Sequence, residues 1–214
     1  RALDAQIPVH PADQQWADFR VSLTELTAYG AAWKRGSAWP IAPAAIPTSY
    51  LTRAIQLWQA GEAYGYNAAS TNAPDWWIPA PGSAGPPVTG PAGATAANGA
   101  ITVDRPHFYT NGMPATVTIT VTPAASVAVY AVEELIPAGW SIPVAQITGG
   151  GFWDATQHKV KWGPFFDATA RVLTYQAVPG PDATDPATFA GGAAFDGNPE
   201  ETTGRRLVFR PHGD

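Results

Sequence analysis

The acidic and imidazole side chains are the residues whose chemistry could support catalysis. Glu133 and Glu134 are adjacent in a strand-like segment, where successive side chains point to opposite faces, so the two carboxylates cannot flank one substrate. His158 lies four residues after Asp154, across a predicted hairpin turn, and a surface turn supplies neither burial nor a third group to orient the imidazole. We therefore interpret His158 as a turn residue and predict that the chain is not an enzyme.

Metal and thiol chemistry have few candidates. The chain has no cysteine, which excludes disulfides, thiolate metal sites and cysteine nucleophiles. None of its four histidines has a second histidine at metal-ligand spacing. The acidic residues of the C-terminal part fall in predicted loops, where we expect solvated charge rather than a cation site; they are Asp182, Asp185, Asp196, Glu200 and Glu201.

Composition limits the function further. Of the 214 residues 14% are charged, against about 25% in ordinary soluble domains. The 12 Lys and Arg against 17 Asp and Glu leave a net charge of −5, which gives no basic footprint for nucleic acid. No apolar run approaches the length of about 18 residues that predicts a membrane span. Hydrophobic residues make up 45% and include nine tryptophans, so we expect a folded chain with a packed core.

Two helices are predicted in the N-terminal part. Ser22 is the expected N-cap of the first helix, because Glu25 three residues later completes a capping box. Apolar residues then recur at three-to-four spacing until Gly36, where this helix is predicted to end. The second helix is predicted to follow Pro47 and to end at Gly61. Two helices this short bury little apolar surface alone, so we expect them to pack on each other.

Residues 67–99 are rich in proline and glycine, and we interpret them as a semi-rigid linker. Trp76 and Trp77 interrupt this composition. Large aromatic side chains in a linker either fold back onto a neighbouring domain or form a patch that binds a partner. Both alternatives stay open for these two tryptophans.

The hydrophobic period changes to two from residue 100 onward. Valine and isoleucine alternate with threonine over 116–122, the pattern of a half-buried strand. Residues 152–162 are expected to form a hairpin, and strands are expected over 171–178 and 207–209. Several short strands separated by turn residues predict an antiparallel sandwich over 100–214.

The first helical segment, residues 13–33, resembles a bacterial dockerin-type module, which is built from EF-hand-like loop–helix units. The second unit, residues 46–58, keeps the helix and has no acidic loop before it. The later segments 117–122, 129–140 and 161–166 are similar to immunoglobulin-like repeats of large secreted bacterial proteins. The resemblances imply a two-domain fold: a small all-α, dockerin-like helical pair over 1–66, the linker over 67–99, and an all-β immunoglobulin-like antiparallel sandwich over 100–214.

The dockerin resemblance also implies a calcium loop. With Val21 at loop position 8, Asp18 falls at position 5 and Glu25 at position 12. Trp16 then occupies position 3 and cannot coordinate, and Asp13 reaches position 1 only if the loop is one residue longer. The implied metal ligands are therefore Asp13, Asp18 and Glu25. A calcium-bound loop and a metal-free packing unit are both consistent with this set.

The resemblances imply a non-catalytic role in attachment or assembly. We expect a segment of a large secreted or cell-surface bacterial protein, such as a subunit of an extracellular filament, whose partners are other protein modules or copies of itself. The start at Arg1 suggests a processed product or a piece of a longer precursor. The alternative is a carbohydrate-binding module of a secreted enzyme, which would stack sugars on Trp140, Trp153 and Trp162, although their positions in apolar strands also suit core packing.

Overall fold

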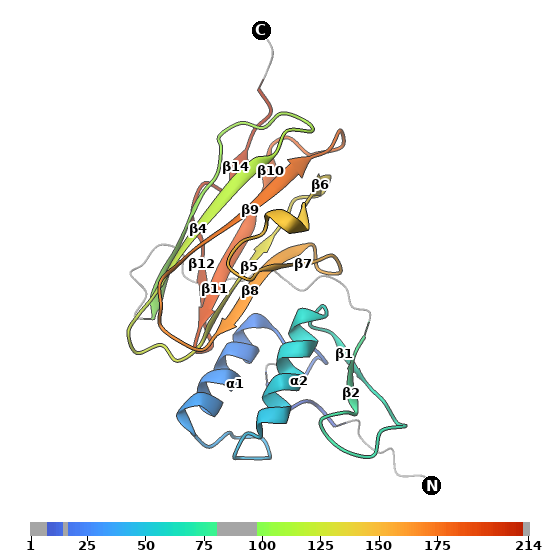
Figure 1. Cartoon of the computed structure of the whole chain (residues 1–214). Helices are drawn as coiled ribbons and strands as arrows, with labels where there is room; N and C mark the ends of the chain where they lie inside the picture. The colour runs from blue at the N-terminus through green and yellow to red at the C-terminus, as the bar shows by residue number, and fades with distance from the viewer. Residues whose placement is uncertain (1–7, 15–16, 81–97, 212–214) are drawn as a thin grey trace.

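The computed structural model describes residues 8–14, 17–80 and 98–211. Within them it contains two helices packed against a larger body of short strands (Figure 1). No helix of this part of the chain is long and apolar enough to cross a membrane.

The first helix, α1, spans Leu23–Arg35 and confirms the predicted caps. The Ser22 hydroxyl oxygen accepts from the Glu25 N–H at 3.3 Å, and the Glu25 carboxylate accepts from the Ser22 N–H at 2.9 Å. This reciprocal pair satisfies donors that the first helical turn leaves without a partner. Gly36 ends the helix in the left-handed conformation, with φ 65°, which glycine adopts without steric cost.

The second helix, α2, spans Thr48–Gln59 and begins after Pro47 as predicted. Its N-terminus has no side-chain cap. Two short strands, β1 (Tyr64–Tyr66) and β2 (Trp77–Pro79), follow α2 and pair antiparallel.

Ten of the remaining strands form two five-stranded sheets. One, here named the helix-side sheet, has the order β12-β11-β5-β8-β7, with bounds Asn198–Glu201, Ala190–Phe195, Tyr130–Leu135, Lys159–Phe165 and Phe152–Asp154. The other, the open sheet, has the order β13-β3-β4-β9-β6, with bounds Thr203–Gly204, Gly99–Asp104, Ala115–Pro123, Arg171–Pro179 and Trp140–Ser141. A short 3-10 helix, η1 (Val144–Gln146), lies beside β9, and β10 (Ala187–Thr188) pairs with β14 (Leu207–Val208).

The alternating pattern explains how the two sheets meet. Along β4, the odd-numbered residues are buried and the threonines between them face outward. Side chains from both sheets form one apolar core, which includes Ile119, Tyr175, Val132 and Trp162. The sheets therefore pack face to face.

The helices pack on the outer face of the helix-side sheet (Figure 1). Ala131 of β5 and Ala194 of β11 belong to the same apolar cluster as the inner faces of α1 and α2. At Gly197 the contact is so close that an added Cβ would lie 2.7 Å from the Ala28 side chain. The chain thus forms three layers: helices, helix-side sheet and open sheet.

The predicted fold class, an all-α dockerin-like pair plus an all-β immunoglobulin-like antiparallel sandwich, is wrong. The fold is β-rich, and the two short helices do not make an all-α domain, because their apolar cluster is completed by Tyr64 and Trp77 of β1 and β2 and by sheet residues. The sandwich is also not purely antiparallel, since β13 pairs parallel to β3. The helices are too short to bury a core of their own, so they use the sheet as its other wall.

Candidate functional site

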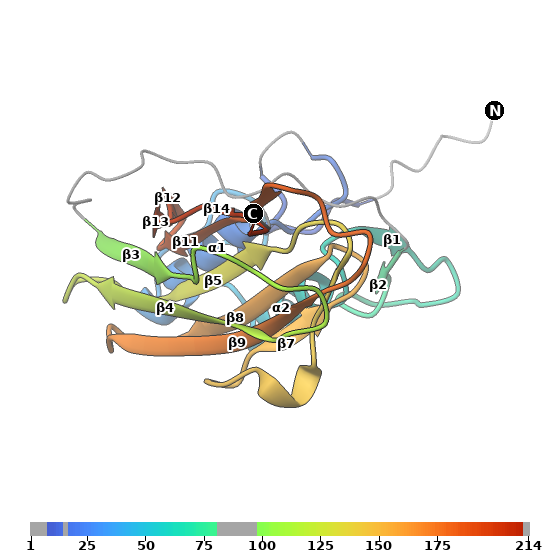
Figure 2. The ribbon, with the colours of Figure 1, turned by 90° about the horizontal axis from the view of Figure 1, so that it is seen from above.

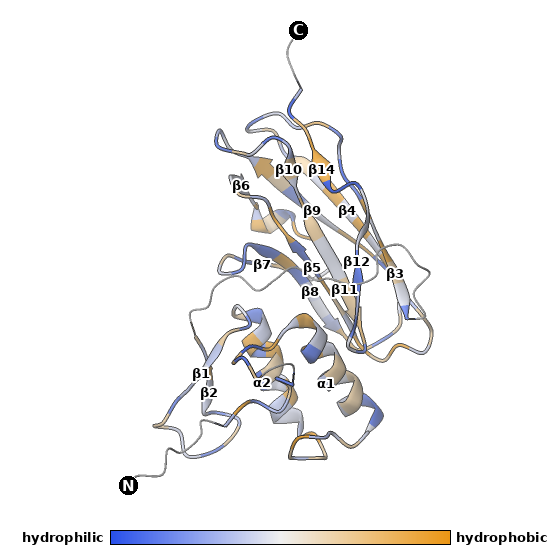
Figure 3. Cartoon of the chain, turned by 180° about the vertical axis from the view of Figure 1, so that it is seen from behind, coloured by the Kyte–Doolittle hydropathy of each residue, from blue (hydrophilic) through white to orange (hydrophobic). Residues whose placement is uncertain are grey.

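The most distinctive feature of the molecule is a set of charged side chains buried between the helices and the helix-side sheet. We name this set the junction cluster; it consists of Arg20, Glu62, Glu133, Asp154, Lys159 and Lys161. Figure 3 shows the hydrophilic residues of β7 and β8 next to α2. The two lysines and three acids have side chains at most 4% exposed, and Arg20 closes the rim.

Glu62 is the centre of the cluster. It follows α2 and has a positive φ of 69°, an uncommon conformation for a residue with a side chain. Its carboxylate lies 3.2 Å from the Lys159 ammonium, 3.1 Å from that of Lys161 and 3.2 Å from the Arg20 guanidinium. One side chain from the helical layer therefore holds two lysines of β8.

The sheet supplies the other acids. Glu133 of β5 lies 2.7 Å from Lys159, and Asp154 of β7 lies 2.9 Å from Lys161. The second oxygen of Asp154 accepts the backbone N–H groups of Thr156 and Gln157, which closes the β7–β8 turn.

Lys161 also connects the two layers. Its ammonium donates to the backbone carbonyl of Trp58 at 3.0 Å and lies 5.0 Å from the centre of the Trp58 indole. The side-chain amide of Gln157 donates to the carbonyl of Gly61 at 2.7 Å. These contacts join the end of α2 to the sheet through donors from β8 and from the β7–β8 turn.

The electrostatics of the cluster favour the charged forms of Glu62 and Lys159 in spite of burial. Burial by itself would raise the pKa of Glu62, but Lys161 and Lys159 hold that pKa below its ordinary value. Burial would lower the pKa of Lys159, but Glu133 and Glu62 hold it above its ordinary value. Burial dominates at Glu133 and raises its pKa. Three acids facing three bases balance the formal charge, and the enclosed set fixes the helices on the sheet.

Glu134 points to the other face of β5, into the core between the sheets. Its carboxylate accepts from Arg105 and, at 3.1 Å, from the Tyr175 hydroxyl. Burial raises the pKa of Tyr175 well above its ordinary value. Glu133 and Glu134 thus face opposite sides of the strand, as predicted.

Lysine is distributed unevenly between the interior and the surface. Two of the three lysines are buried, and Lys34 is the exposed one. Among the described residues, the surface therefore exposes a single lysine.

The predicted calcium ligands act as hydrogen-bond acceptors within the N-terminal segment. One oxygen of Asp13 accepts from the Tyr64 hydroxyl at 2.6 Å and from the Phe19 N–H at 3.0 Å. Asp18 accepts from the backbone N–H of Arg20, and Glu25 belongs to the capping box. In the part of the chain that the structure describes, no group of three or more His, Asp or Glu side chains is placed to hold a metal ion.

Trp76 and Trp77 fold back onto the helical layer. Trp77 is 2% exposed, and its indole N–H donates to the Pro8 carbonyl at 2.7 Å. Trp76 packs, partly buried, on the same apolar cluster. Burial leaves Trp77 little surface for a partner. Residues 81–97 of the predicted linker lie outside the described residues.

The candidate sugar-stacking tryptophans lie mostly inside the molecule. Trp140 is 5% exposed and Trp162 is fully buried, both in the core between the sheets. Trp153 packs partly buried on that core, and its ring lies 5.5 Å from that of the exposed His158. A sugar-binding platform needs exposed rings, so these three residues do not form one.

The outer surface of the open sheet carries a regular array of threonines. We name this surface the threonine face; its six threonines are Thr102, Thr116, Thr118, Thr120, Thr122 and Thr174. The registers place Thr102 beside Thr120, and Thr118 beside Thr174. Figure 2 shows β4 and β9 side by side along one border of the molecule.

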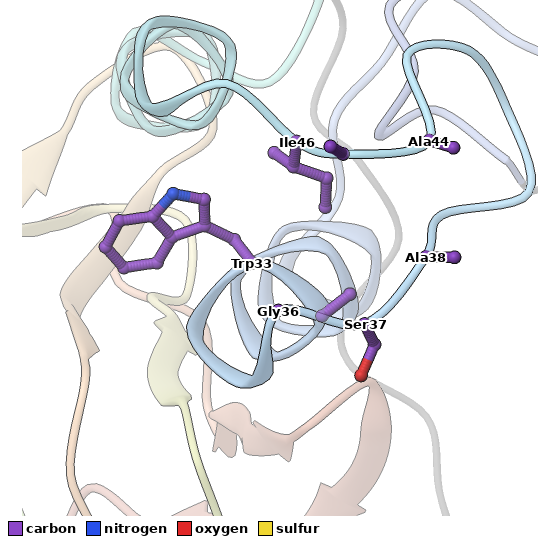
Figure 4. A pocket seen from close by; sticks show the side chains of 8 residues that line it. Trp33, Gly36, Ser37, Ala38, Ala44 and Ile46 are labelled. Carbon is purple, nitrogen blue, oxygen red and sulfur yellow. The ribbon is translucent and has the colours of Figure 1, made fainter.

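A hollow of about 410 Å³ lies where α1 ends and the chain turns back toward α2. Figure 4 shows Trp33 and Ile46 close together in it, with Ala38 and Ala44 on the connecting loop. Its lining is mostly apolar, includes Ser37 and contains no titratable side chain. The Ser37 hydroxyl is the one side-chain polar group of this lining besides the Trp33 indole N–H, and no lining residue supplies an acid or a base to activate it.

Sequence reasoning missed the junction cluster. Lys159 and Lys161 alternate with the core residues Val160 and Trp162, which is the pattern of a strand with a solvated outer face. The available clue was that two of only three lysines occur on one face of one predicted strand.

Comparisons with known proteins identify no family. No family model and no curated protein matches the chain. Among solved structures, the chain is similar to an exo β-N-acetylglucosaminidase from Vibrio harveyi in complex with N-acetylglucosamine, with 7% identity, a TM-score of 0.33, and coverage of 54% of this chain and 19% of that one. It is also similar to the CARDB domain of the PF1109 protein from Pyrococcus furiosus, with 17% identity, a TM-score of 0.27, and coverage of 56% of this chain and 94% of that one. The chain thus spans a small part of the first of these proteins, and both likenesses are too low to carry a functional argument.

Proposed function

We propose that this chain is a non-catalytic attachment and assembly segment of a secreted or cell-surface protein, and that it contributes to a larger extracellular structure such as a filament. The observation that carries the proposal is the placement of charge. Lysines, glutamates and aspartates that would ordinarily solvate the surface are enclosed in the junction cluster. The surface that remains is low in charge and suits contact with other protein surfaces.

Rigidity supports the same role. A structural segment transmits position only if its parts do not move relative to each other. Here the buried ion pairs and the apolar cluster join the helices to the helix-side sheet. Arg35 adds an ion pair from the end of α1 to Asp196, whose carboxylate also accepts the N–H groups of Ala128 and Val129.

The edges of the sheets favour packing through faces. The strands at the four edges, β12, β7, β13 and β6, are two to four residues long. Short edge strands expose few backbone groups, which limits the addition of a neighbour's strand. Assembly through a broad face fits this architecture better than strand exchange along an edge.

The proposal is tested on the protein in its native source. Because two of the three lysines are buried, the cross-linker should react with groups other than amines. Cross-linking of the intact native source, with mass spectrometry of the linked peptides and electron microscopy, should find this chain joined to copies of itself or to other extracellular proteins. A chain that is recovered from the source as an isolated monomer, with no cross-linked neighbour, would overturn the proposal.

A further inference from the structure

The contact between Asp154 and Lys161 in the junction cluster differs from an ordinary ion pair. Nζ of Lys161 lies 2.9 Å from Oδ2 of Asp154, and both side chains are at most 3% exposed. Oδ2 nevertheless has no hydrogen-bond partner among the residues that the structure describes. Since the distance is short enough for a hydrogen bond, the direction of approach is what excludes one. Nζ donates instead to Glu62 at 3.1 Å and to the Trp58 carbonyl at 3.0 Å.

The other carboxylate oxygen of Asp154 is fixed by the backbone. Oδ1 accepts the N–H of Thr156 at 3.0 Å and the N–H of Gln157 at 3.1 Å. Two backbone donors aimed at one oxygen stabilise negative charge that develops there during attack on the adjoining carbon, as an oxyanion hole does. The Asp154 carboxyl group therefore has one polarised oxygen and one oxygen without a hydrogen bond beside a buried amine.

We propose that Lys161 and Asp154 join covalently through an intramolecular amide, an isopeptide bond between β8 and β7. The Nζ lone pair attacks Cγ of Asp154, the Nζ–Cγ bond forms, the Cγ–Oδ2 bond breaks, and Oδ2 leaves as water. Of the three protons of the ammonium, one stays on the amide nitrogen and two leave in the water. One positive and one negative charge disappear together, so the step needs no other reactant.

Glu62 is the catalytic residue for this step. An ammonium has no lone pair until it loses a proton, and the Glu62 carboxylate accepts a hydrogen bond from Nζ. It can take that proton and return one to the leaving oxygen, a general acid–base role that contributes about 10²–10⁴-fold. Lys161 is the foremost of the charges that hold the pKa of Glu62 low, and this effect ends as the proton leaves Nζ.

Proximity and burial both favour the bond. An amine and a carboxyl group held in contact react as parts of one molecule, with effective concentrations of about 10⁵–10⁸ M. The bond replaces a buried pair of charges by a neutral amide, which removes their desolvation penalty. Glu62 keeps its contacts of 3.2 Å with Lys159 and with Arg20, so the rest of the junction cluster still holds the helices on the sheet.

The experiment is mass spectrometry of the full, denatured chain. The wild-type chain should weigh about 18 Da less than its sequence, because one water molecule has left, and its digest should contain a branched peptide that joins Asp154 to Lys161. Lys161→Arg keeps the positive charge but has no amine that can lose its proton, so it should have the full sequence mass. Lys159→Arg is the matched control at the other buried lysine of β8 and should keep the mass deficit.

Glu62→Gln tests the catalytic residue. In samples taken during cell-free synthesis, this variant should acquire the mass deficit about a hundredfold or more slowly than the wild type, while circular dichroism verifies its fold. Equal rates would overturn the role of Glu62.

Two results would overturn the bond itself. One is a folded wild-type chain with its full sequence mass and no branched peptide, a result that does not depend on the folding of any variant. The other is a mass deficit that persists in Lys161→Arg. Neither result bears on the assembly function, which cross-linking in the native source tests separately.

Discussion

The junction cluster makes a quantitative prediction for Lys161→Met. Methionine keeps most of the length and the apolar stem of the lysine but removes its charge. The variant leaves Glu62 and Asp154 without the ammonium that lies 3.1 and 2.9 Å from them, and the Trp58 carbonyl without its donor. Removing one partner of a buried ion pair leaves an uncompensated charge, which costs about 3–5 kcal/mol of folding free energy.

The control for this variant is Arg206→Met. Arg206 pairs with Glu201 at 3.2 Å, but its side chain is 51% exposed. Because water and salt screen such a pair, its loss costs at most about 1 kcal/mol. The two substitutions remove one positive charge each, so they differ mainly in burial.

The assay is urea unfolding at neutral pH, followed by tryptophan fluorescence. Lys161→Met should lower the unfolding midpoint far more than Arg206→Met, with a similar dependence on denaturant. Adding Asp154→Asn to Lys161→Met should recover part of the loss, because it removes the carboxylate charge that Lys161 balanced and leaves the Glu62 pairs with Lys159 and Arg20 in place. A loss for Lys161→Met no larger than that for Arg206→Met would refute the view that the cluster holds the layers together.

Further predictions concern the N-terminal part of the molecule. Burial lowers the pKa of His10 to about 4, so the folded state loses stability as the pH falls from about 6.5 toward 4, where the unfolded chain takes up a proton that the buried imidazole resists. Burial raises the pKa of Asp13 to about 6, so the folded state loses stability as the pH rises from about 3.8 toward 6, where the unfolded chain releases a proton that the buried carboxyl retains. The effects of these two groups on stability oppose each other between pH 4 and 6. Across this range the melting temperature should therefore rise with pH in Asp13→Asn, which keeps His10, and fall with pH in His10→Gln, which keeps Asp13. Equal dependence of the melting temperature on pH in both variants would contradict these pKa shifts. Ser22→Ala removes the α1 cap and should cost about 1 kcal/mol in urea unfolding, whereas Thr52→Ala, at an exposed position of α2, should cost less. Since Asp13, Asp18 and Glu25 accept backbone and hydroxyl hydrogens, we expect chelation with EDTA to leave the melting temperature unchanged; a clear decrease would instead support a calcium ion in this segment.

Short-range patterns were sufficient for the helices and several strands. The capping box at Ser22 and the glycine at 36 act within one helical turn, so α1 has the predicted bounds. The period-two pattern of 116–122 depends on neighbouring residues in the same strand, and β4 follows it. Pro47 located the N-terminus of α2 for a similarly local reason. Proline lacks the backbone N–H that the interior of a helix needs, so a helix can begin at proline but does not run through it.

The candidate site could not be found in this way. Glu62 and Lys161 are separated by almost 100 residues, and no local period relates them. A lysine at an outward strand position ordinarily indicates that this face of the sheet is exposed to solvent. The same alternation of lysine with core residues is found when a helical layer covers that face. Only the packing of α2 on β8 distinguishes the two cases.

The sequence by itself determined the low charge of the chain, the helices at its N-terminal end and the alternating strands after residue 100. It also determined that one acidic pair, Glu133 and Glu134, faces opposite sides of a strand. The tertiary structure decided where the charge resides and which surfaces remain open. Burial is a property of layers that meet across long sequence separations, so it determines whether a lysine is solvated or enclosed. For this chain it encloses Lys159 and Lys161 and leaves the threonine face exposed.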